Sequence, residues 1–280
     1  MKVGDRLLDS AIVAAEPLLW GFTNRSWRVD LADGRRVAAQ QYPDPVAAAR
    51  RVRIMRQLPG RFAAAGLPRL PRILATTGVT VVTEWVDGAV GSELLESGVS
   101  TAVAIAASDV ARRLRQVEVD GLDLPDEWAS ASDLASISAE RTAALDGLSL
   151  PAREAMTGAF EALDDIYRSR SPVFAHGDLN PTNVLVGEDG RIVALLDVEF
   201  ARLAPPAFDA AWWDWVIRFH HGRTWPRMRE AFEAAGGLAG ISSEEVLALQ
   251  KLRALELAAD ATPETRAMWL ERVEITARWR

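Results

Sequence analysis

The 280-residue sequence contains no cysteine, which excludes disulfide bonds, thiolate catalysis and sulfur-ligated metals. It also lacks a long apolar run. Charged residues from Lys2 to Glu16 interrupt the start of the chain, and no stretch reaches the roughly 18 residues that a membrane span requires. We therefore expect no targeting segment, no membrane partner and a cytoplasmic location.

Lysine is nearly absent as well, since only Lys2 and Lys251 accompany the many arginines. No cluster of basic residues stands out and the formal net charge is −7, which argues against nucleic acid as a partner. A cationic small molecule is easier to accommodate. The hydrophobic content of 49% and charged content of 25% are those of an ordinary globular protein with one large domain or two moderate ones.

Hydrophobic patterning predicts strands in the first part of the chain. Apolar and polar residues alternate over 26–31, and the turn residues Asp33-Gly34 then predict a hairpin with 35–42. Further strands are predicted at 17–20, 72–75 and 79–85, and an amphipathic helix at 46–58.

The remainder of the chain has helical periodicity. Helices are predicted over 100–117, 131–145, 151–169, 207–220, 226–235, 242–259 and 263–279. The pattern indicates an α+β fold of two lobes separated by a cleft. Residues 1–86 form a small lobe with an antiparallel sheet and one helix, and residues 87–280 form a larger, mainly helical lobe.

The most informative segment is 176–186, His-Gly-Asp-Leu-Asn-Pro-Thr-Asn-Val-Leu-Val, which is followed by Leu-Leu-Asp-Val-Glu at 195–199. A polar loop with Asp and Asn five positions apart, then two short strands of which the second ends in Asp, is the layout that holds magnesium-nucleotide phosphates against a hydroxyl. The His-Gly-Asp and Asn identities recur by chance on the order of 10⁻⁶ per position. The segment predicts phosphoryl transfer.

The polar residues of this segment have different predicted roles. Asp178 orients the acceptor hydroxyl and takes its proton. Asn183, through its amide oxygen, and Asp197 hold Mg²⁺, a cation that prefers oxygen ligands. Glu199 faces the same side as Asp197 and contacts the substrate, a second metal or the metal's water shell.

Two neighbouring residues are assigned to loop ordering. His176 lies two residues from Asp178, and we expect it to order the loop by hydrogen bonding rather than to act as a base. Asp209 stands near the start of a predicted helix, where a carboxylate either begins the helix or holds the loop.

The segment 211–225 is unusually rich in aromatic residues. Trp212 and Trp215 lie three apart on a predicted helix and are expected to pack in the core. Trp213 then points elsewhere, together with Asp214, toward the cleft. An aromatic face beside a carboxylate suits a cationic or sugar-like acceptor.

Segments 176–186 and 195–199, with Pro-Ala-Phe-Asp-Ala at 206–210, resemble the catalytic segments of the aminoglycoside phosphotransferase and choline kinase-like family, which has the protein-kinase-like fold. The segment 83–88, Thr-Glu-Trp-Val-Asp-Gly, resembles the hinge of that family.

The resemblance assigns roles to matching positions. It implies that Asp178 is the catalytic Asp and that Asn183 and Asp197 are the magnesium ligands. It also implies that backbone groups of Glu84 and Val86 hold the purine edge of ATP or GTP.

The N-terminal lobe departs from the family pattern. Proteins of this fold usually place a Lys on the third strand, where it binds phosphates and pairs with a helix Glu. Here Gln40 takes the Lys position and Arg51 lies near the Glu position. Because glutamine cannot neutralise phosphate charge, we hypothesise that Arg51 or Arg25 replaces the lysine. The alternative is that the arginines between 50 and 56 form a solvated helix face.

The loop 21–26 contains a single glycine and is a weak phosphate-binding signal. Thr23, Asn24 and Ser26 either contact the phosphates or belong to a plain hairpin turn, and the sequence favours neither.

The sequence therefore predicts a Mg²⁺- and nucleoside-triphosphate-dependent phosphotransferase that acts on a hydroxyl of a small molecule, such as an aminoglycoside-like or other antibiotic. One alternative is a kinase of a small metabolite, an amino alcohol or a sugar. The other is a catalytically weak, nucleotide-binding pseudokinase, which Gln40 and Arg51 favour. Retention of Asp178, Asn183 and Asp197 together argues against it.

Overall fold

Six strands near the beginning of the chain form one antiparallel sheet. The computed structural model describes residues 2, 4–18, 24–168 and 170–280. The strand order is β1-β2-β3-β4-β6-β5, and each neighbouring pair is antiparallel. The strands are β1 (Arg6–Leu7), β2 (Ser10–Leu18), β3 (Arg25–Leu31), β4 (Arg36–Gln41), β5 (Ile73–Thr77) and β6 (Thr80–Glu84).

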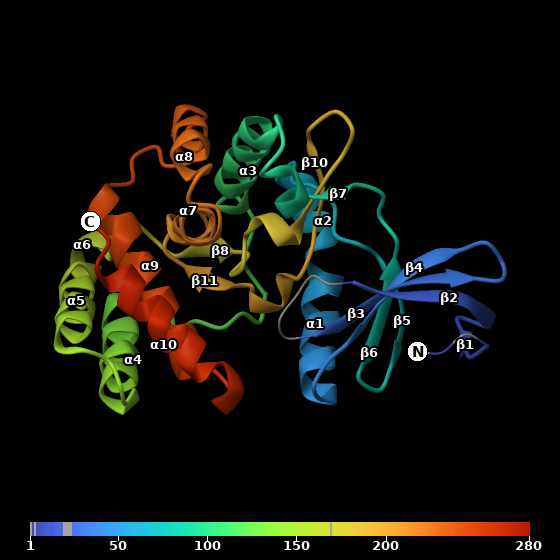
Figure 1. The fold of residues 1–280 in the computed structure, drawn as a ribbon, viewed down its shortest axis with the longest axis horizontal. Helices are drawn as coiled ribbons and strands as arrows, with labels where there is room; N and C mark the ends of the chain where they lie inside the picture. Colours follow the sequence, from blue (N-terminus) through green and yellow to red (C-terminus); the bar gives the residue numbers. More distant parts are fainter. Residues whose placement is uncertain (1, 3, 19–23, 169) are drawn as a thin grey trace.

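Alternating apolar side chains give this sheet two buried faces. On one face, Val29 and Val82 lie in a small apolar cluster formed by the strands themselves. On the other face, Val81 packs in a cluster with Val52 of α1 (Pro45–Gln57). The sheet therefore carries α1 on the side that faces the rest of the molecule (Figure 1).

A second helix, α2 (Pro59–Ala64), follows α1, so the expectation of one helix in this lobe is wrong. Pro59 has no backbone N–H with which to continue α1, but its fixed φ suits the first turn of a new helix. Phe62 gives α2 its buried contact with the main core.

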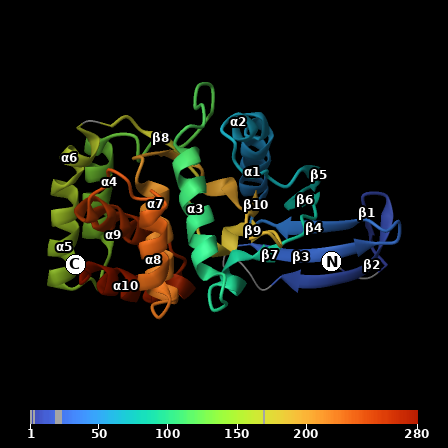
Figure 2. The same ribbon diagram turned by 90° about the horizontal axis from the view of Figure 1, so that it is seen from above.

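The other end of the molecule is helical, as expected (Figures 1 and 2). The predicted helices are present, and the one expected over 151–169 is divided into α5 and α6. The helices are α3 (Ser100–Leu114), α4 (Ala131–Ala144), α5 (Leu150–Glu161), α6 (Leu163–Tyr167), α7 (Phe208–His220), α8 (Trp225–Ala234), α9 (Ser243–Ala259) and α10 (Pro263–Ala277).

Short buried strands hold the polar loops of the motif. Antiparallel pairing joins β8 to β11, and β9 to both β10 and β7. The loop at 176–183 thus starts and ends on strands that are fixed in the core. The short elements are β7 (Ala89–Val90), η1 (Gly91–Leu94), β8 (Val173–Ala175), η2 (Pro181–Asn183), β9 (Val184–Val186), β10 (Ile192–Leu195), η3 (Val198–Phe200) and β11 (Arg202–Ala204).

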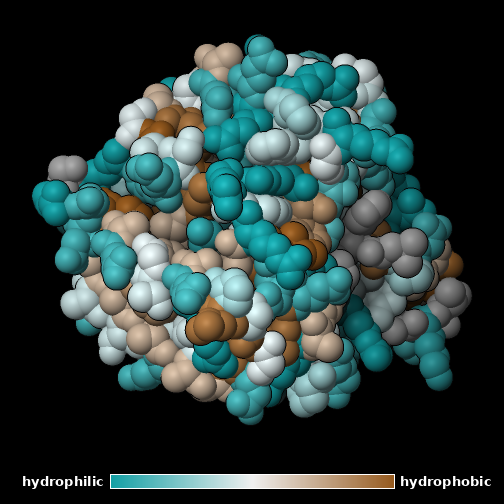
Figure 3. Space-filling view, turned by 60° about the vertical axis from the view of Figure 1, so that its left-hand side comes forward, coloured by the Kyte–Doolittle hydropathy of each residue, from teal (hydrophilic) through white to brown (hydrophobic). Residues whose placement is uncertain are grey.

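The predicted α+β fold, with a small sheet-containing lobe and a larger helical lobe, is confirmed. Within the described residues, no helix combines the length and the apolar character needed to cross a bilayer. The face over the C-terminal helices mixes hydrophilic and hydrophobic side chains, as exposed protein surfaces do (Figure 3).

A buried ion cluster joins α9 to β11. Glu256 is 4% exposed and lies between Arg202 and Arg253, at 2.7 and 2.5 Å from their Nη1 atoms. Burial disfavours the charged carboxylate, but the two guanidinium groups outweigh it and hold the pKa of Glu256 at about 2. The cluster stabilises the fold only while its charges balance.

Glu256→Gln is expected to destabilise the protein by about 3–5 kcal/mol at neutral pH, because it leaves two buried guanidinium groups without a counter-charge. Urea unfolding measures the loss, and the same change at exposed Glu271 is the control, with an effect within about 0.5 kcal/mol.

This contribution also has a defined pH dependence. The folded-state pKa of Glu256 is depressed from 4.5 to about 2, so its stabilisation is present above the unfolded-state value and is lost as the pH falls toward 2. The stability difference between wild type and Glu256→Gln should narrow over that range. Equal free energies of unfolding for wild type and Glu256→Gln at pH 7 would contradict the stabilising role of the ion cluster.

Candidate active site

The loop that follows β8 is held from beneath by α7. Asp209 accepts hydrogen bonds from the backbone N–H groups of His176 and Gly177, at 2.8 and 3.0 Å. Burial raises the pKa of Asp209 to about 6, against the lowering effect of these two bonds. The arrangement is the one that a loop-ordering carboxylate requires.

The fully buried side chain of His176 joins the two motif loops. Its Nε2 lies 2.8 Å from the Leu196 carbonyl oxygen, and its Nδ1 lies 3.3 Å from the backbone N of Asp178. Because the amide N–H can only donate, Nδ1 accepts and Nε2 carries the proton. Burial lowers the pKa of His176 to about 4, so the ring is neutral and orders the loop through both nitrogens.

Glycine is required between these residues. Gly177 has a φ of +83°, and a Cβ atom there would lie 1.9 Å from the Phe200 carbonyl oxygen. Its own carbonyl accepts a hydrogen bond of 3.1 Å from Arg253. The close approach brings the loop at 176–183 against η3, which follows Asp197.

Asp178 is fixed through both carboxylate oxygens. Oδ1 accepts a 2.8 Å hydrogen bond from the indole N–H of Trp212, and Oδ2 accepts one of 2.8 Å from the Asn183 amide. The carboxylate is partly exposed. Desolvation raises the pKa of Asp178. The positive charge of Arg253 and the hydrogen bond from Trp212 oppose this rise. A basic, oriented carboxylate at a surface opening is suited to accept a proton from a hydroxyl.

Trp212 is a site residue that the sequence interpretation assigned to packing alone. It does stack on Trp215, with ring centroids 4.6 Å apart, but its N–H reaches Asp178. One signal was available: Trp212 follows Asp209 by three positions, which places both on the face of α7 that meets the loop.

Asn183 and Asp197 are brought together by the backbone. The Leu196 N–H donates to the Asn183 carbonyl at 2.9 Å, and Asp197 follows in a left-handed conformation with φ of 51°. The Asn183 amide N–H₂ donates to Asp178, so its Oδ1 is directed away from that residue.

These two side chains fit Mg²⁺. Among the described residues, none donates a hydrogen bond to Asn183 Oδ1 or to Asp197 Oδ2. Magnesium commonly takes one or two such oxygens and completes its shell with phosphates and water. In the described ranges, no cluster of three or more His, Asp or Glu residues could hold a metal alone. The oxygen pair therefore suits a cation that is shared with a nucleotide.

Arg51 from α1 reaches across to the same loop. Its Nη1 lies 3.2 Å from Asp197 Oδ1 and 3.8 Å from Glu199 Oε2, and the residue is 4% exposed. Arg50, Arg53 and Arg56 are exposed. The alternative prediction of a solvated helix face therefore fits these three arginines, whereas Arg51 is buried.

Two amide side chains complete this cluster. Gln40 Nε2 lies 3.3 Å from Asp197 Oδ1, and the Asn24 amide donates to Glu199 Oε1 at 2.9 Å. Burial, reinforced by the charge of Asp197, raises the pKa of Glu199 to about 7. The residues expected at the Lys and Glu positions, Gln40 and Arg51, thus converge on Asp197.

The remaining predicted nucleotide contacts are more scattered. Ser26 lies opposite Gln40 across β3 and β4, whereas Arg25 at the start of β3 is exposed. Thr23 lies outside the described residues. Among the described residues, neither Arg25 nor Ser26 makes a hydrogen bond or ion pair with Asp197, whereas Gln40 and Arg51 do.

The predicted hinge lies at the end of β6. The Glu84 N–H donates to the Arg72 carbonyl at 2.9 Å, and the Glu84 side chain forms an ion pair with Arg69. Among the described residues, no partner takes the Val86 N–H. Val86 packs in an apolar cluster with Leu185.

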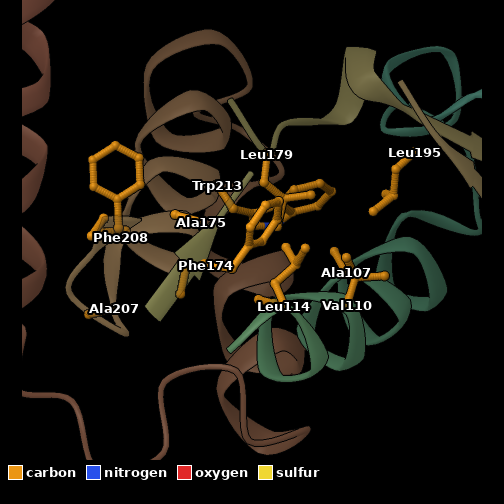
Figure 4. Packing of buried hydrophobic residues seen from close by; sticks show 14 of the residues in the cluster. Ala107, Val110, Leu114, Phe174, Ala175, Leu179, Leu195, Ala207, Phe208 and Trp213 are labelled. Atoms are coloured by element: carbon orange, nitrogen blue, oxygen red, sulfur yellow. The ribbon is translucent and has the colours of Figure 1, made fainter. Parts of the chain in front are cut away.

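The expectation that Trp213 and Asp214 face the cleft is wrong. Trp213 is 2% exposed and points into the main core, near Leu179 and Phe174 (Figure 4). Asp214 is 4% exposed and accepts hydrogen bonds from Trp225, Gln250 and Arg229. Because α7 is covered by α3, α8 and α9, its faces away from the loop are buried too.

Gly177→Ala is expected to destabilise the protein by several kcal/mol and to abolish phosphoryl transfer, because the loop must move away from Phe200. Gly190→Ala is a matched control. Its φ is +77° and its nearest contact is 3.9 Å away, so it carries the backbone cost alone, about 1–2 kcal/mol. Thermal unfolding compares the two, and equal losses would contradict the steric argument.

Several solved phosphotransferases have a similar structure. Macrolide 2'-phosphotransferase MphH from Brachybacterium faecium is 18% identical with a TM-score of 0.65, over 95% of this chain and 92% of that one. Aminoglycoside 2'-phosphotransferase-IIIa in its GDP complex is 16% identical with a TM-score of 0.72, over 95% and 93%. A thermostable mutant of aminoglycoside phosphotransferase APH(4)-Ia is 17% identical with a TM-score of 0.70, over 96% and 95%. At these identities the similarity establishes the fold.

Sequence comparison places the chain in a family. The uncharacterized protein YcbJ from Bacillus subtilis (strain 168) is 35% identical over 74 residues, which are 26% of this chain and 23% of that protein, so the match spans about a quarter of the relative. A model of the family described as "Phosphotransferase enzyme family" (APH) matches residues 14–269. The protein therefore belongs to the APH phosphotransferase enzyme family.

Proposed function

We propose that this enzyme transfers the γ-phosphoryl group of a nucleoside triphosphate, bound with Mg²⁺, to a hydroxyl of a small molecule. The observation that carries the proposal is the connected set Asp178–Asn183–Asp197. Asn183 donates to Asp178 through its amide and accepts from the residue before Asp197 through its carbonyl. These bonds connect the two motif loops, so the proposed base, Asp178, lies close to the two proposed magnesium ligands, Asn183 and Asp197.

Asp178 acts on the acceptor. Its carboxylate accepts the hydroxyl proton while the acceptor oxygen forms a bond to the γ-phosphorus, and the bond between that phosphorus and the β,γ-bridging oxygen breaks. A carboxylate can take the proton late in such a reaction. Asn183 and Asp197 would hold the cation, which when bound neutralises charge on the phosphates.

The nucleotide base is assigned to the hinge. The Val86 N–H has no partner among the described residues. Val86 belongs to a buried apolar cluster, and the partly buried Val90, Val193 and Leu196, which pack against that cluster, present an apolar surface. A purine offers a hydrogen-bond acceptor and a flat apolar face, which such a surface accommodates. Both ATP and GTP meet these requirements.

Arg51 is assigned to the phosphates. It is the buried arginine of its helix and lies 3.2 Å from Asp197, whereas Arg25 is exposed and Gln40 is uncharged. A guanidinium can bind two phosphate oxygens in one plane, so a single arginine can serve where a lysine is absent.

The proposed acceptor is an aminoglycoside-like or other antibiotic. Enzymes of similar structure are named for macrolides and aminoglycosides, and one of them was solved with ADP and hygromycin B. An assay of ADP production over hygromycin B, further aminoglycosides, macrolides, amino alcohols and sugars tests this assignment. Turnover of an amino alcohol or sugar alone would indicate a metabolite kinase. Normal magnesium-nucleotide binding without any turnover would indicate a pseudokinase.

Asp178→Asn is expected to lower kcat by a factor of roughly 10²–10⁴, because the acceptor loses its base, while nucleotide affinity stays the same. Steady-state kinetics and calorimetry measure the two quantities. Asp189→Asn, in the exposed turn between β9 and β10, is the control. Full activity of Asp178→Asn would overturn the mechanism.

Arg51→Met is expected to weaken binding of magnesium-ATP by roughly 10–100-fold, the usual worth of a charge-assisted hydrogen bond. Methionine keeps much of the side-chain length, and Arg50→Met is the matched control on the exposed face of the same helix. Isothermal calorimetry gives both affinities. An unchanged affinity for Arg51→Met together with a loss for Arg25→Met would transfer the role to Arg25.

A further inference from the structure

We propose that Trp212 is a positioning residue of the transfer reaction: its indole N–H fixes Oδ1 of Asp178 and so orients the carboxylate toward the acceptor hydroxyl. The inference rests on the proposed function. It starts from the 2.8 Å bond between Trp212 Nε1 and Asp178 Oδ1. A tryptophan that is 4% exposed needs a partner for its N–H, and here the partner is the carboxylate itself.

The two oxygens of Asp178 are held from different parts of the chain. Oδ2 is held by Asn183, five residues along the same loop, and Oδ1 by Trp212 on α7. Rotation of an Asp carboxylate about its last side-chain bond is soft, so one bond alone leaves the oxygens free to turn. With both bonds present the unshared lone pairs have a fixed direction, which is the preorganisation that phosphoryl transfer depends on.

Trp212 is itself held firmly. The Arg253 guanidinium lies 5.7 Å from the centroid of its ring and donates to the carbonyl of Gly177, next to Asp178. Trp215 stacks on the indole with an interplanar angle of 11°. The position of the Asp178 carboxylate is therefore fixed, through the Trp212 indole, by residues of α7 and α9.

Trp225 supplies a matched comparison outside the site. Its indole N–H donates at 2.7 Å to the carboxylate of Asp214 on α7, and this bond is partly buried like that of Trp212. Trp225→Phe and Trp212→Phe each remove one indole, retain an aromatic ring and delete one hydrogen bond to an aspartate. A purely structural role for Trp212 predicts the same consequences for both variants.

The contact can be observed without catalysis. In the nucleotide-free protein with ¹⁵N-labelled tryptophan, the Trp212 indole resonance is assigned by its loss in Trp212→Phe. In Asp178→Asn that resonance should move upfield, because a neutral amide is a weaker acceptor than a carboxylate. The Trp225 resonance should move less. A Trp212 resonance that does not respond to Asp178→Asn would overturn the inference.

The consequence is tested by ADP release from magnesium-ATP with water as the acceptor, which requires no identified substrate. Trp212→Phe is expected to lower kcat by roughly 10-fold or more, with KM for ATP unchanged and with the same melting temperature as Trp225→Phe. In an Asp178→Asn background the same change should cost less than about twofold, because Trp212 acts through that carboxylate.

The outcomes separate the two proposals. An active wild type in which Trp212→Phe retains the kcat of Trp225→Phe, or in which its loss persists in Asp178→Asn, overturns the positioning role alone. A wild type that releases no ADP with water or with any acceptor overturns the proposed function and the positioning role with it.

Discussion

The geometry of the site depends on the buried carboxylate of Asp209. It accepts the N–H groups of His176 and Gly177, and these two bonds determine where the loop leaves β8. Once the loop is placed, His176 can bridge to the Leu196 carbonyl and Gly177 can pass against Phe200. Desolvation of Asp209 costs free energy, which the two backbone bonds offset only in part, since its pKa stays raised to about 6. One anion on α7 thereby sets the relative position of both motif loops.

Part of this arrangement follows from sequence. The order of polar residues in 176–186 and 195–199 indicated the reaction class, since identities at fixed spacing specify loop chemistry directly. Helix positions followed from periodicity. The positions of Trp212 and Trp213 could not be predicted in the same way. Because α7 is buried on nearly all sides, its periodicity does not indicate which face meets the loop at 176–183. The clash that requires Gly177 involves Phe200, 23 positions away, and pairing at that distance is set by the tertiary fold.

Charges in the N-terminal lobe are distributed in an unusual way. In protein kinases a strand Lys pairs with a helix Glu, and the pair links that helix to its own sheet. Here the helix supplies the cation, Arg51. Its carboxylate partners belong to the other lobe, where Asp197 immediately precedes η3 and Glu199 lies within it. Gln40 on β4 contributes a hydrogen bond to Asp197 without a charge. The sequence revealed the missing lysine, and in the fold Arg51 is the arginine of α1 that lies beside Asp197, where the proposed phosphate contact requires it.

Because the cation is on the helix and its carboxylate partners are on the other lobe, α1 is held by contacts different from those in a kinase. In a kinase the phosphate-binding Lys belongs to the sheet, and the helix Glu pairs with it within the same lobe. Arg51 is buried and is paired instead with Asp197, 3.2 Å away, whose side chain is 30% exposed. Any displacement of α1 from η3 leaves the buried Arg51 guanidinium without its counter-charge, which is costly. The ion pair therefore holds α1 against the loop that carries Asp197, and under the proposed function it places the phosphate-binding charge beside the metal oxygens.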